Sequence, residues 1–293
     1  MSLQPTTSVQ QAMAQLDEHG VALLADALSA AQVTDVRARL EAAARLSEED
    51  EVPTRGYAFD TDSKNRRVFQ LFNLDPVFVD LIAREPALDF VRHSLGDSFL
   101  VSNFSANITA PGSGRMLLHA DQGYVDTPWA DHALACNVAW LLDDFTAENG
   151  GTCYVPGSHR LGRGPIRDEV VETVAIEAAA GTMMIMDGRL WHQTGANRSK
   201  DCHRAALFGY YVVRWLRPQI NWTAALWPQV AANMTPEFLD MLGYYTGNTE
   251  YQIPCGRQAA VRRSTALDEM RTGEYALHAG GVRHGAPVTA RPL

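Results

Sequence analysis

The segment RMLLHADQGY, residues 115–124, ends an apolar run with His119 and Asp121, two side chains that bind metal ions. If the run is a β-strand, residues i and i+2 point to the same face, so both ligands project side by side. Their Cα atoms are then about 6–7 Å apart, close enough for both side chains to bind one ion. Two histidines with one carboxylate suit Fe(II), among other metals, and leave coordination positions open. A metal site therefore requires a third ligand from elsewhere.

Two downstream histidines compete for the third position. His192 follows a glycine-led apolar segment and a DG turn, and Arg204 begins the aromatic segment RAALFGYYVVRW twelve residues later. This spacing predicts that His192 and Arg204 come from adjacent antiparallel strands facing one cavity, where a guanidinium can bind a carboxylate through two hydrogen bonds. His159 follows a Pro-Gly turn, which is typical of a surface or capping residue. His192 is the preferred third ligand.

The elements that must position these residues change in character at about residue 97. Before it, the spacing of apolar residues and the turn residues Gly20 and Ser29 predict helices separated by one short strand. After it, short runs of β-branched and aromatic residues alternate with turn-forming residues, which predicts a sandwich or barrel. The predicted helices are 8–20, 30–46, two within 75–96, and 235–245; the predicted strands are 21–28, 98–110, 115–120, 133–142, 152–156, 172–178, 181–187 and 204–215.

These elements predict one domain, mainly β. It has a helical N-terminal layer (about 1–96), a β core (about 97–217) and a C-terminal extension (about 218–293) whose last fifteen or so residues look like a loose tail.

The composition of the 293 residues excludes some classes of function. The net charge of −9 argues against a general binder of nucleic acids or anionic membranes. No apolar run of about 18 residues predicts a membrane span, and the N-terminus lacks the pattern of a signal peptide, which favours the cytoplasm. The four cysteines have no metal-binding or disulfide spacing, so we expect reduced thiols, of which Cys202 is the most exposed.

Three stretches together resemble the phytanoyl-CoA dioxygenase family of Fe(II)- and 2-oxoglutarate-dependent oxygenases. They are His119-Ala-Asp121, AWLLDDFTAENGGTCYVPGSHR (139–160) and GTMMIMDGRLWHQTGANRSKDCHRAALFGYYV (181–212). The similarity is strongest over residues 115–213, and a weaker similarity lies in residues 68–96. It does not extend beyond about residue 220.

The resemblance implies a double-stranded β-helix, a jelly-roll of two four-stranded sheets of the cupin-like kind. It also implies that His119, Asp121 and His192 hold Fe(II) at its mouth. Arg204 and Thr194 would hold the distal carboxylate of the cosubstrate 2-oxoglutarate, and O₂ would be the second cosubstrate. Asn107 and Trp140 match less specific positions lining the cosubstrate pocket; as ordinary strand residues they need have no such role.

The expected reaction is hydroxylation of an unactivated C–H bond of a small organic molecule, with release of succinate and CO₂. Relatives that halogenate replace the metal carboxylate with a small residue, and Asp121 is intact here. The loop 123–133 is a candidate for covering the mouth and can equally be an ordinary surface loop. The segment 55–67 is a second candidate, although its charge run favours a solvated loop. The candidate substrate contacts are Tyr124, Trp129, Phe208, Tyr210 and either Arg66 or Arg67.

Two alternatives stay open at this stage. One is a zinc-dependent enzyme of another type on the same barrel, and the other is a non-catalytic small-molecule binder. Arg204 and Thr194 count against the first, which needs no dicarboxylate, and the three ligands count against the second. The sequence does not identify the substrate or the oligomeric state.

Overall fold

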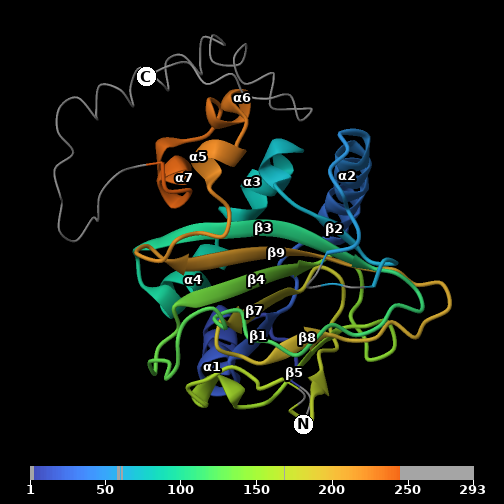
Figure 1. The fold of residues 1–293 in the computed structure, drawn as a ribbon, viewed down its shortest axis with the longest axis vertical. Coiled ribbons are helices and arrows are strands. Elements are labelled where there is room, and N and C mark those ends of the chain that lie inside the picture. The colour runs from blue at the N-terminus through green and yellow to red at the C-terminus, as the bar shows by residue number, and fades with distance from the viewer. Residues whose placement is uncertain (1–2, 58–59, 61, 168, 245–293) are drawn as a thin grey trace.

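The computed structural model describes residues 3–57, 60, 62–167 and 169–244, and its fold is a barrel-like pair of antiparallel β-sheets with helices packed outside (Figure 1). The predicted loose tail and the rest of residues 245–293 lie outside the described residues. The helices are α1 (Val9–His19), α2 (Ala30–Glu49), α3 (Val77–Ile82), α4 (Ala87–Leu95), α5 (Trp222–Ala225), α6 (Pro228–Ala231) and α7 (Pro236–Met241), with short 3-10 turns η1 (Leu71–Asn73) and η2 (Ser158–Arg160).

The larger sheet has six strands in the order β1-β7-β4-β9-β3-β2, all antiparallel. Its two longest strands, β3 and β9, pair along nearly their whole length. The bounds are β1 (Val21–Leu24), β2 (Arg66–Val68), β3 (Phe99–Thr109), β4 (Ala135–Leu141), β7 (Met183–Asp187) and β9 (Arg204–Val213).

The smaller sheet has three strands in the order β6-β5-β8, with bounds β5 (Thr152–Tyr154), β6 (Val174–Ala175) and β8 (His192–Thr194). The expected double-stranded β-helix is confirmed, but its sheets are not four-stranded. β1 and β2 extend the larger sheet at its edges, and the segment before Asp121 joins β8 only through an isolated bridge between His119 and His192. Residues 115–120 are therefore not the regular strand that their apolar run predicts.

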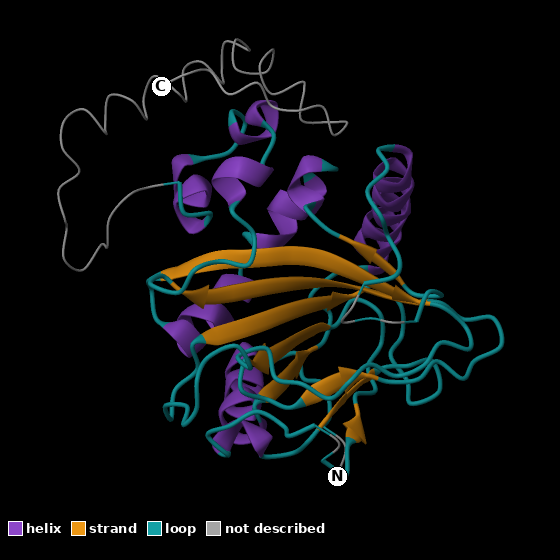
Figure 2. Ribbon diagram, in the orientation of Figure 1, coloured by secondary structure: helices purple, strands orange, loops and turns teal. Residues whose placement is uncertain are grey.

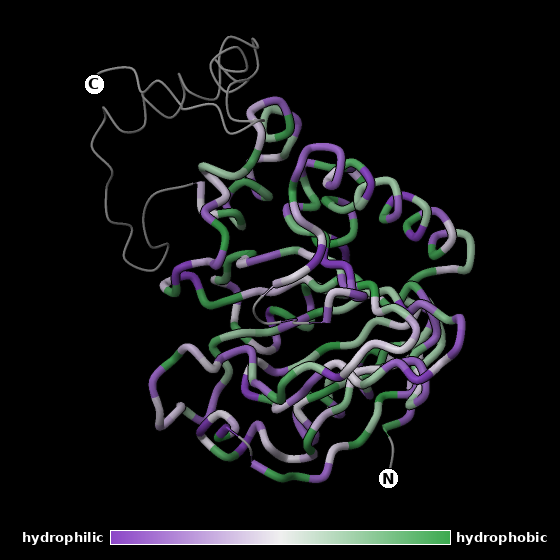
Figure 3. Tube along the Cα trace, turned by 45° about the vertical axis from the view of Figure 1, so that its right-hand side comes forward, coloured by the Kyte–Doolittle hydropathy of each residue, from purple (hydrophilic) through white to green (hydrophobic). Residues whose placement is uncertain are grey.

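The two faces of the larger sheet have different partners because side chains alternate along each strand. On β9, Leu207 and Tyr211 pack with the helices, whereas Ala206 and Phe208 belong to the cluster inside the barrel. Figure 3 shows hydrophobic residues concentrated on the central strands and hydrophilic residues more frequent in the outer helices and loops. The inward face of the larger sheet and the smaller sheet thus enclose the space in which a site can form.

The helices cover the outer face of the larger sheet, which Figure 2 shows as purple ribbons outside the orange strands. The helix start predicted at Ser29 and the helix end predicted at Gly20 are confirmed, whereas α2 runs three residues beyond its predicted end at residue 46. Ser29 caps α2 through a reciprocal capping box with Gln32, and Gly20 ends α1 in the left-handed conformation that glycine favours. The strand at His192 was expected and is β8, whereas the short elements β2, α5 and α6 were not predicted.

Two further expectations can be compared with the described residues. Within them, none of the helices has both the length and the apolar character needed to cross a bilayer. Cys136 is buried, Cys153 is half-buried and Cys202 is exposed, and all three are free thiols, whereas Cys255 lies outside the described residues.

Candidate active site

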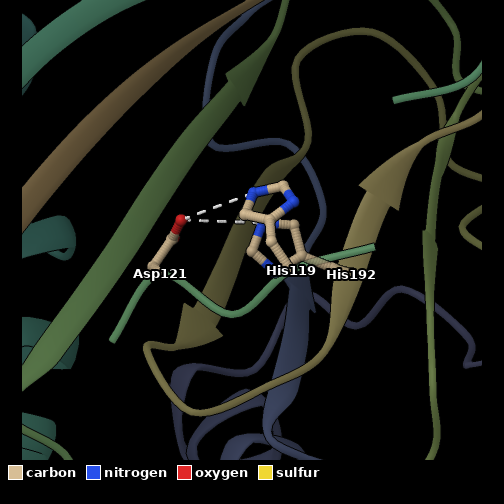
Figure 4. Close-up of side chains that lie close together, drawn as sticks. All are labelled: His119, Asp121 and His192. Carbon is tan, nitrogen blue, oxygen red and sulfur yellow. Dashed lines mark ion pairs between the residues drawn. The ribbon is translucent and has the colours of Figure 1, made fainter. Parts of the chain in front are cut away.

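Three side chains that can bind one metal ion meet at the open edge of the barrel: His119, Asp121 and His192 (Figure 4). Their potential ligand atoms all lie within 4.8 Å of one another. Oδ1 of Asp121 is 3.8 Å from Nε2 of His119 and 3.8 Å from Nε2 of His192. Among the residues that the structure describes, this is the one group of three or more such side chains that could share an ion.

Different local structures present the three ligands. His192 begins β8, and its backbone exchanges hydrogen bonds of 2.8 and 3.0 Å with that of His119. Asp121 starts a turn closed by the bond from the Gly123 N–H to the Ala120 carbonyl, 2.9 Å. His119 and Asp121 therefore converge because the chain turns after the bridge, and not because they alternate along one strand.

Both imidazoles are oriented by the backbone two residues earlier. Nδ1 of His119 lies 2.9 Å from the Leu117 carbonyl, and Nδ1 of His192 lies 3.0 Å from the Leu190 carbonyl. A carbonyl only accepts, so each Nδ1 carries a proton, and Nε2, which faces Asp121, is the ring atom left for a metal. Desolvation and the neighbouring His192 lower the pKa of His119, which favours the neutral, ligating form.

Two residues hold Asp121 from the larger sheet. The Asn137 amide on β4 donates to Oδ2 of Asp121 at 2.9 Å, and the Tyr210 hydroxyl on β9 donates to its backbone carbonyl at 2.9 Å. The Tyr124 hydroxyl lies 3.0 Å from that of Tyr210. Since the Tyr210 proton is committed to the carbonyl, Tyr124 is the donor. Sequence reasoning missed Asn137; its only signal was its position on the inward face of β4.

The chemistry of the donor set fits a divalent metal. Two neutral nitrogens and one carboxylate oxygen, each with its other polar atom already bonded to the protein, are typical of a first-row transition-metal site with open positions. Fe(II) is one of the metals that such ligands accept. The residues present therefore fit the expected iron.

Arg204 lies inside the barrel at the start of β9 and is completely buried. Nη2 donates to the Gly150 carbonyl at 2.7 Å, and the guanidinium lies over the Phe145 ring at 4.5 Å. Nε and Nη1 have no hydrogen-bond partner, and no ion pair to Arg204 exists in the described part of the chain. Burial, with the nearby positive charge of Arg67, lowers the pKa of Arg204 to about 9. A buried cation with two free donors fits a carboxylate from a ligand.

The strand arrangement around Arg204 differs from the prediction. His192 and Arg204 are not on adjacent strands: β8 belongs to the smaller sheet, and Arg204 pairs with Thr109 on β3 of the larger one. The two residues come from facing sheets. The prediction was wrong because it assumed that two strands close in sequence pair with each other, whereas in a jelly-roll consecutive strands can lie in different sheets.

Thr194 and Asn107 lie close together between these two groups. Thr194 is two residues after His192 on β8 and so shares its face, and Nδ2 of Asn107 lies 3.4 Å from Oγ1 of Thr194. Oδ1 of Asn107 is buried and has no hydrogen-bond partner among the described residues. Trp140, in contrast, contacts Phe104 and packs in the helix-side core, on the outer face of β4.

The residues considered for the substrate separate into different environments. Tyr124 is half-exposed and Phe208 half-buried, whereas Tyr210 is buried with its hydroxyl committed to Asp121. Trp129 is buried against Trp191, away from solvent.

The paired arginines on β2 point in opposite directions. Arg67 lies on the inward face, opposite Asn107, and forms a buried ion pair with Asp60 at 2.8 Å. Arg66 faces outward and pairs with Glu41 of α2 at 2.6 Å. His159, the other histidine considered as a ligand, is buried in η2 against Gly20 and is not part of the metal-ligand group.

The sequence is similar to known dioxygenases. The family model for phytanoyl-CoA dioxygenase matches residues 16–206. A dioxygenase of Aspergillus fumigatus, af480, is 40% identical over 240 residues, which cover 81% of this chain and 77% of that protein.

Solved structures show the same fold. EctD from S. alaskensis superposes with a TM-score of 0.59 at 22% identity, covering 75% of this chain and 86% of that one. HygX from Streptomyces hygroscopicus, crystallised with nickel, 2-oxoglutarate and hygromycin B, has a TM-score of 0.57 at 16% identity, covering 72% and 90%.

Proposed function

Because the chain belongs to the phytanoyl-CoA dioxygenase family, we propose that it is a non-haem Fe(II)- and 2-oxoglutarate-dependent dioxygenase. In this proposal it hydroxylates an unactivated C–H bond of a small organic molecule. The overall balance is one substrate C–H, one O₂ and one 2-oxoglutarate giving one C–OH, succinate and CO₂.

The observation that carries the proposal is that one barrel contains two charged groups, each without a partner of opposite charge. At the mouth, Asp121 and two neutral histidines form a ligand set for a cation. Inside, Arg204 is a buried cation with two free donors and no acidic partner among the described residues. A divalent metal bound to Asp121 leaves one net positive charge at the mouth, and Arg204 carries one positive charge inside the barrel. A dicarboxylate that reaches from the metal to Arg204 neutralises both, because it has one negative charge at each end.

Each residue of the site has a defined part in this reaction. His119 and His192 hold the metal through Nε2, and Asp121 holds it through Oδ1. Arg204 and the Thr194 hydroxyl bind the distal carboxylate, which fixes the direction in which the cosubstrate enters. When bound there, Fe(II) would supply the redox chemistry that activates O₂. The apolar cluster inside the barrel, with Phe145 and Tyr154, excludes water from the cosubstrate.

The mouth favours a substrate with apolar surface. Leu117, 80% exposed, and Tyr124, 51% exposed, flank the ligand pair on the same segment, and Phe208 lies on the inward face of β9. Neither arginine on β2 is available to an acidic substrate as a free cation, since Arg66 and Arg67 are both ion-paired. HygX was crystallised with a small organic molecule, hygromycin B, and the proposal assigns a substrate of small-molecule size to this chain as well.

Hydroxylation is proposed over halogenation because Asp121 occupies the carboxylate position of the ligand set. A chloride would need that position free. The carboxylate is further held by Asn137, which keeps it in place.

Turnover of the cosubstrate tests the proposal. The purified protein with Fe(II) and 2-oxoglutarate should convert 2-oxoglutarate to succinate slowly in air, and faster when an apolar substrate from a screening set is present. Mass spectrometry should then find a product heavier by one oxygen atom. Asp121→Ala should lose both activities. A wild-type protein that folds, yet neither consumes 2-oxoglutarate nor binds Fe(II), would contradict the proposal.

A further inference from the structure

We propose that Asn137 is a positioning residue that restricts Asp121 to binding the metal through one oxygen, Oδ1. The inference rests on the metal site of the proposed function and extends the Asn137 contact to the way in which Asp121 binds the metal. It concerns the orientation of one carboxylate, and it follows from contacts on β4, β8 and β9.

The contact between the two side chains has a defined direction. Asn137 lies on the inward face of β4, is 7% exposed, and its Nδ2 is 2.9 Å from Oδ2 of Asp121. An ionised carboxylate only accepts hydrogen bonds, so the carboxamide must turn its NH₂ group toward it.

The two oxygens of Asp121 have different environments as a result. Oδ1 is 3.8 Å from Nε2 of both His119 and His192. Oδ2 faces the larger sheet and is held by Asn137. With Oδ2 held, one oxygen is left for a metal, which keeps the remaining positions for the cosubstrate and O₂.

Asp121 needs this support more than the other two ligands do. His192 is fixed by the β8 ladder, and His119 is fixed to it by two backbone hydrogen bonds. Asp121 lies in a turn and takes part in neither ladder. Its main chain is held by the hydroxyl of Tyr210, whose register partner on β4 is Asn137. One strand thus holds the main chain of Asp121, and the neighbouring strand holds its side chain.

The remaining polar atom of Asn137 argues against a purely structural role. Its Oδ1 is buried and has no hydrogen-bond partner among the residues described. An asparagine that served the fold alone would gain from satisfying both ends, and a leucine of similar size would avoid the unpaired acceptor. The fold is therefore expected to tolerate leucine here, and the metal site is expected not to.

Asn103 provides a matched control. It lies on β3 at the other side of Tyr210, as the register partner of that residue in the β3–β9 pair. Its amide donates to Gln219 at 3.1 Å rather than to Asp121. Asn103→Leu and Asn137→Leu therefore make the same chemical change on two strands flanking β9, and only the second releases the Asp121 carboxylate.

The experiment measures Mn(II) affinity, 2-oxoglutarate affinity of the Mn(II)-loaded protein, and the unfolding midpoint of the metal-free protein. Mn(II) is used because it binds the same ligands without reacting with O₂. Asn137→Leu should keep the wild-type midpoint and lose about 10- to 100-fold in Mn(II) affinity, the usual effect of removing a residue that orients a metal ligand. Its 2-oxoglutarate affinity should fall as well. Asn103→Leu should match the wild type in all three.

Each other outcome has a definite meaning. If Asn137→Leu binds Mn(II) and 2-oxoglutarate as the wild type does, the inference is wrong and the proposed function stands. If the leucine variant does not fold, Asn137→Ser replaces it, since the serine hydroxyl is too short to reach Oδ2. If Asn137→Leu and Asn137→Ser both lower the unfolding midpoint of the metal-free protein, Asn137 serves the fold and the inference is wrong. If the wild type binds no metal, the proposed function fails first.

Discussion

Arg204→Met is expected to separate binding from stability, because Arg204 is a buried charge that the protein itself does not neutralise. Its Nε and Nη1 groups are unpartnered, and its one hydrogen bond goes to the Gly150 carbonyl. Methionine has a similar length and no charge. The metal- and cosubstrate-free variant should therefore be at least as stable as the wild type.

The magnitude follows from the contacts that are lost. Two unpartnered donors cost about 1–3 kcal/mol each, so their removal favours the variant by about 2–6 kcal/mol. Against this stand the charged hydrogen bond to Gly150, about 1.5–3 kcal/mol, and the stacking on Phe145, about 2 kcal/mol. These contributions nearly cancel. Replacement of buried charges by apolar groups elsewhere is neutral or stabilises by about 1–4 kcal/mol, which sets the expected range.

The effect on 2-oxoglutarate should be large and in the opposite direction. The two free N–H groups of Arg204 would make charge-assisted hydrogen bonds to the distal carboxylate. At about 1.5–3 kcal/mol each, their loss amounts to about 3–6 kcal/mol. The Kd for 2-oxoglutarate should therefore rise by about 10²- to 10⁴-fold.

Urea unfolding of the metal-free protein and titration with 2-oxoglutarate in the presence of Mn(II) measure the two quantities. Arg67→Met is the matched control, since it also removes a buried arginine from the barrel. It leaves Asp60, 4% exposed, without its ion pair, so it should lower the unfolding free energy by about 3–5 kcal/mol.

Two results would contradict a carboxylate-binding role of Arg204. If Arg204→Met binds 2-oxoglutarate as the wild type does, the carboxylate lies elsewhere. If instead Arg204→Met destabilises the metal-free protein as much as Arg67→Met, Arg204 is a structural residue whose charge the fold already satisfies.

Three further predictions concern neighbouring residues. Thr194→Val removes one hydrogen bond to the charged distal carboxylate of the cosubstrate, about 1.5–3 kcal/mol. Steady-state kinetics should therefore show the KM for 2-oxoglutarate raised about 10- to 100-fold with kcat nearly unchanged, and an unaltered KM would exclude the contact. Tyr210→Phe leaves the Asp121 carbonyl and the Tyr124 hydroxyl without their shared partner. The free energy of unfolding in urea should fall by about 1 kcal/mol, and Mn(II) binding should weaken. A variant with the stability and Mn(II) affinity of the wild type would contradict this. The pKa of His119 is lowered to about 4, so the unfolded metal-free chain binds more protons than the folded one between about pH 6.5 and 4. The free energy of unfolding measured in urea should therefore fall as the pH drops through that window. His119→Gln should show a smaller fall, and an equal fall would count against His119 as its source.

The helical layer could be predicted largely from the sequence because its signals are local. Ser29 and Gly20 are capping residues that act within one turn, and the structure places helix ends at both. The long strands β3, β4 and β9 were also predictable from their apolar runs. β2 was not, because Arg66 and Arg67 read as part of a charged loop, and only pairing with β3 makes them a strand.

For the site, the sequence identified the ligand residues but not the contacts between distant segments that bring them together. The sequence nominated His119, Asp121 and His192, and the structure brings them together. The sequence did not show how these three side chains meet, because the turn at Asp121 and the bridge to β8 depend on contacts across the barrel. Asn137 could not be singled out from the sequence either, since its bond to Asp121 joins residues on different elements.

The proposed site is tested most directly by an anaerobic titration of the metal-free protein with Fe(II) and 2-oxoglutarate, followed by visible absorption. The wild type should give a weak metal-to-ligand charge-transfer band that requires both additions and is lost in Asp121→Ala and in His192→Ala. Arg204→Met should need far more 2-oxoglutarate to reach the same band. If well-folded wild-type protein gives no band, this site is not an Fe(II)- and 2-oxoglutarate-binding centre.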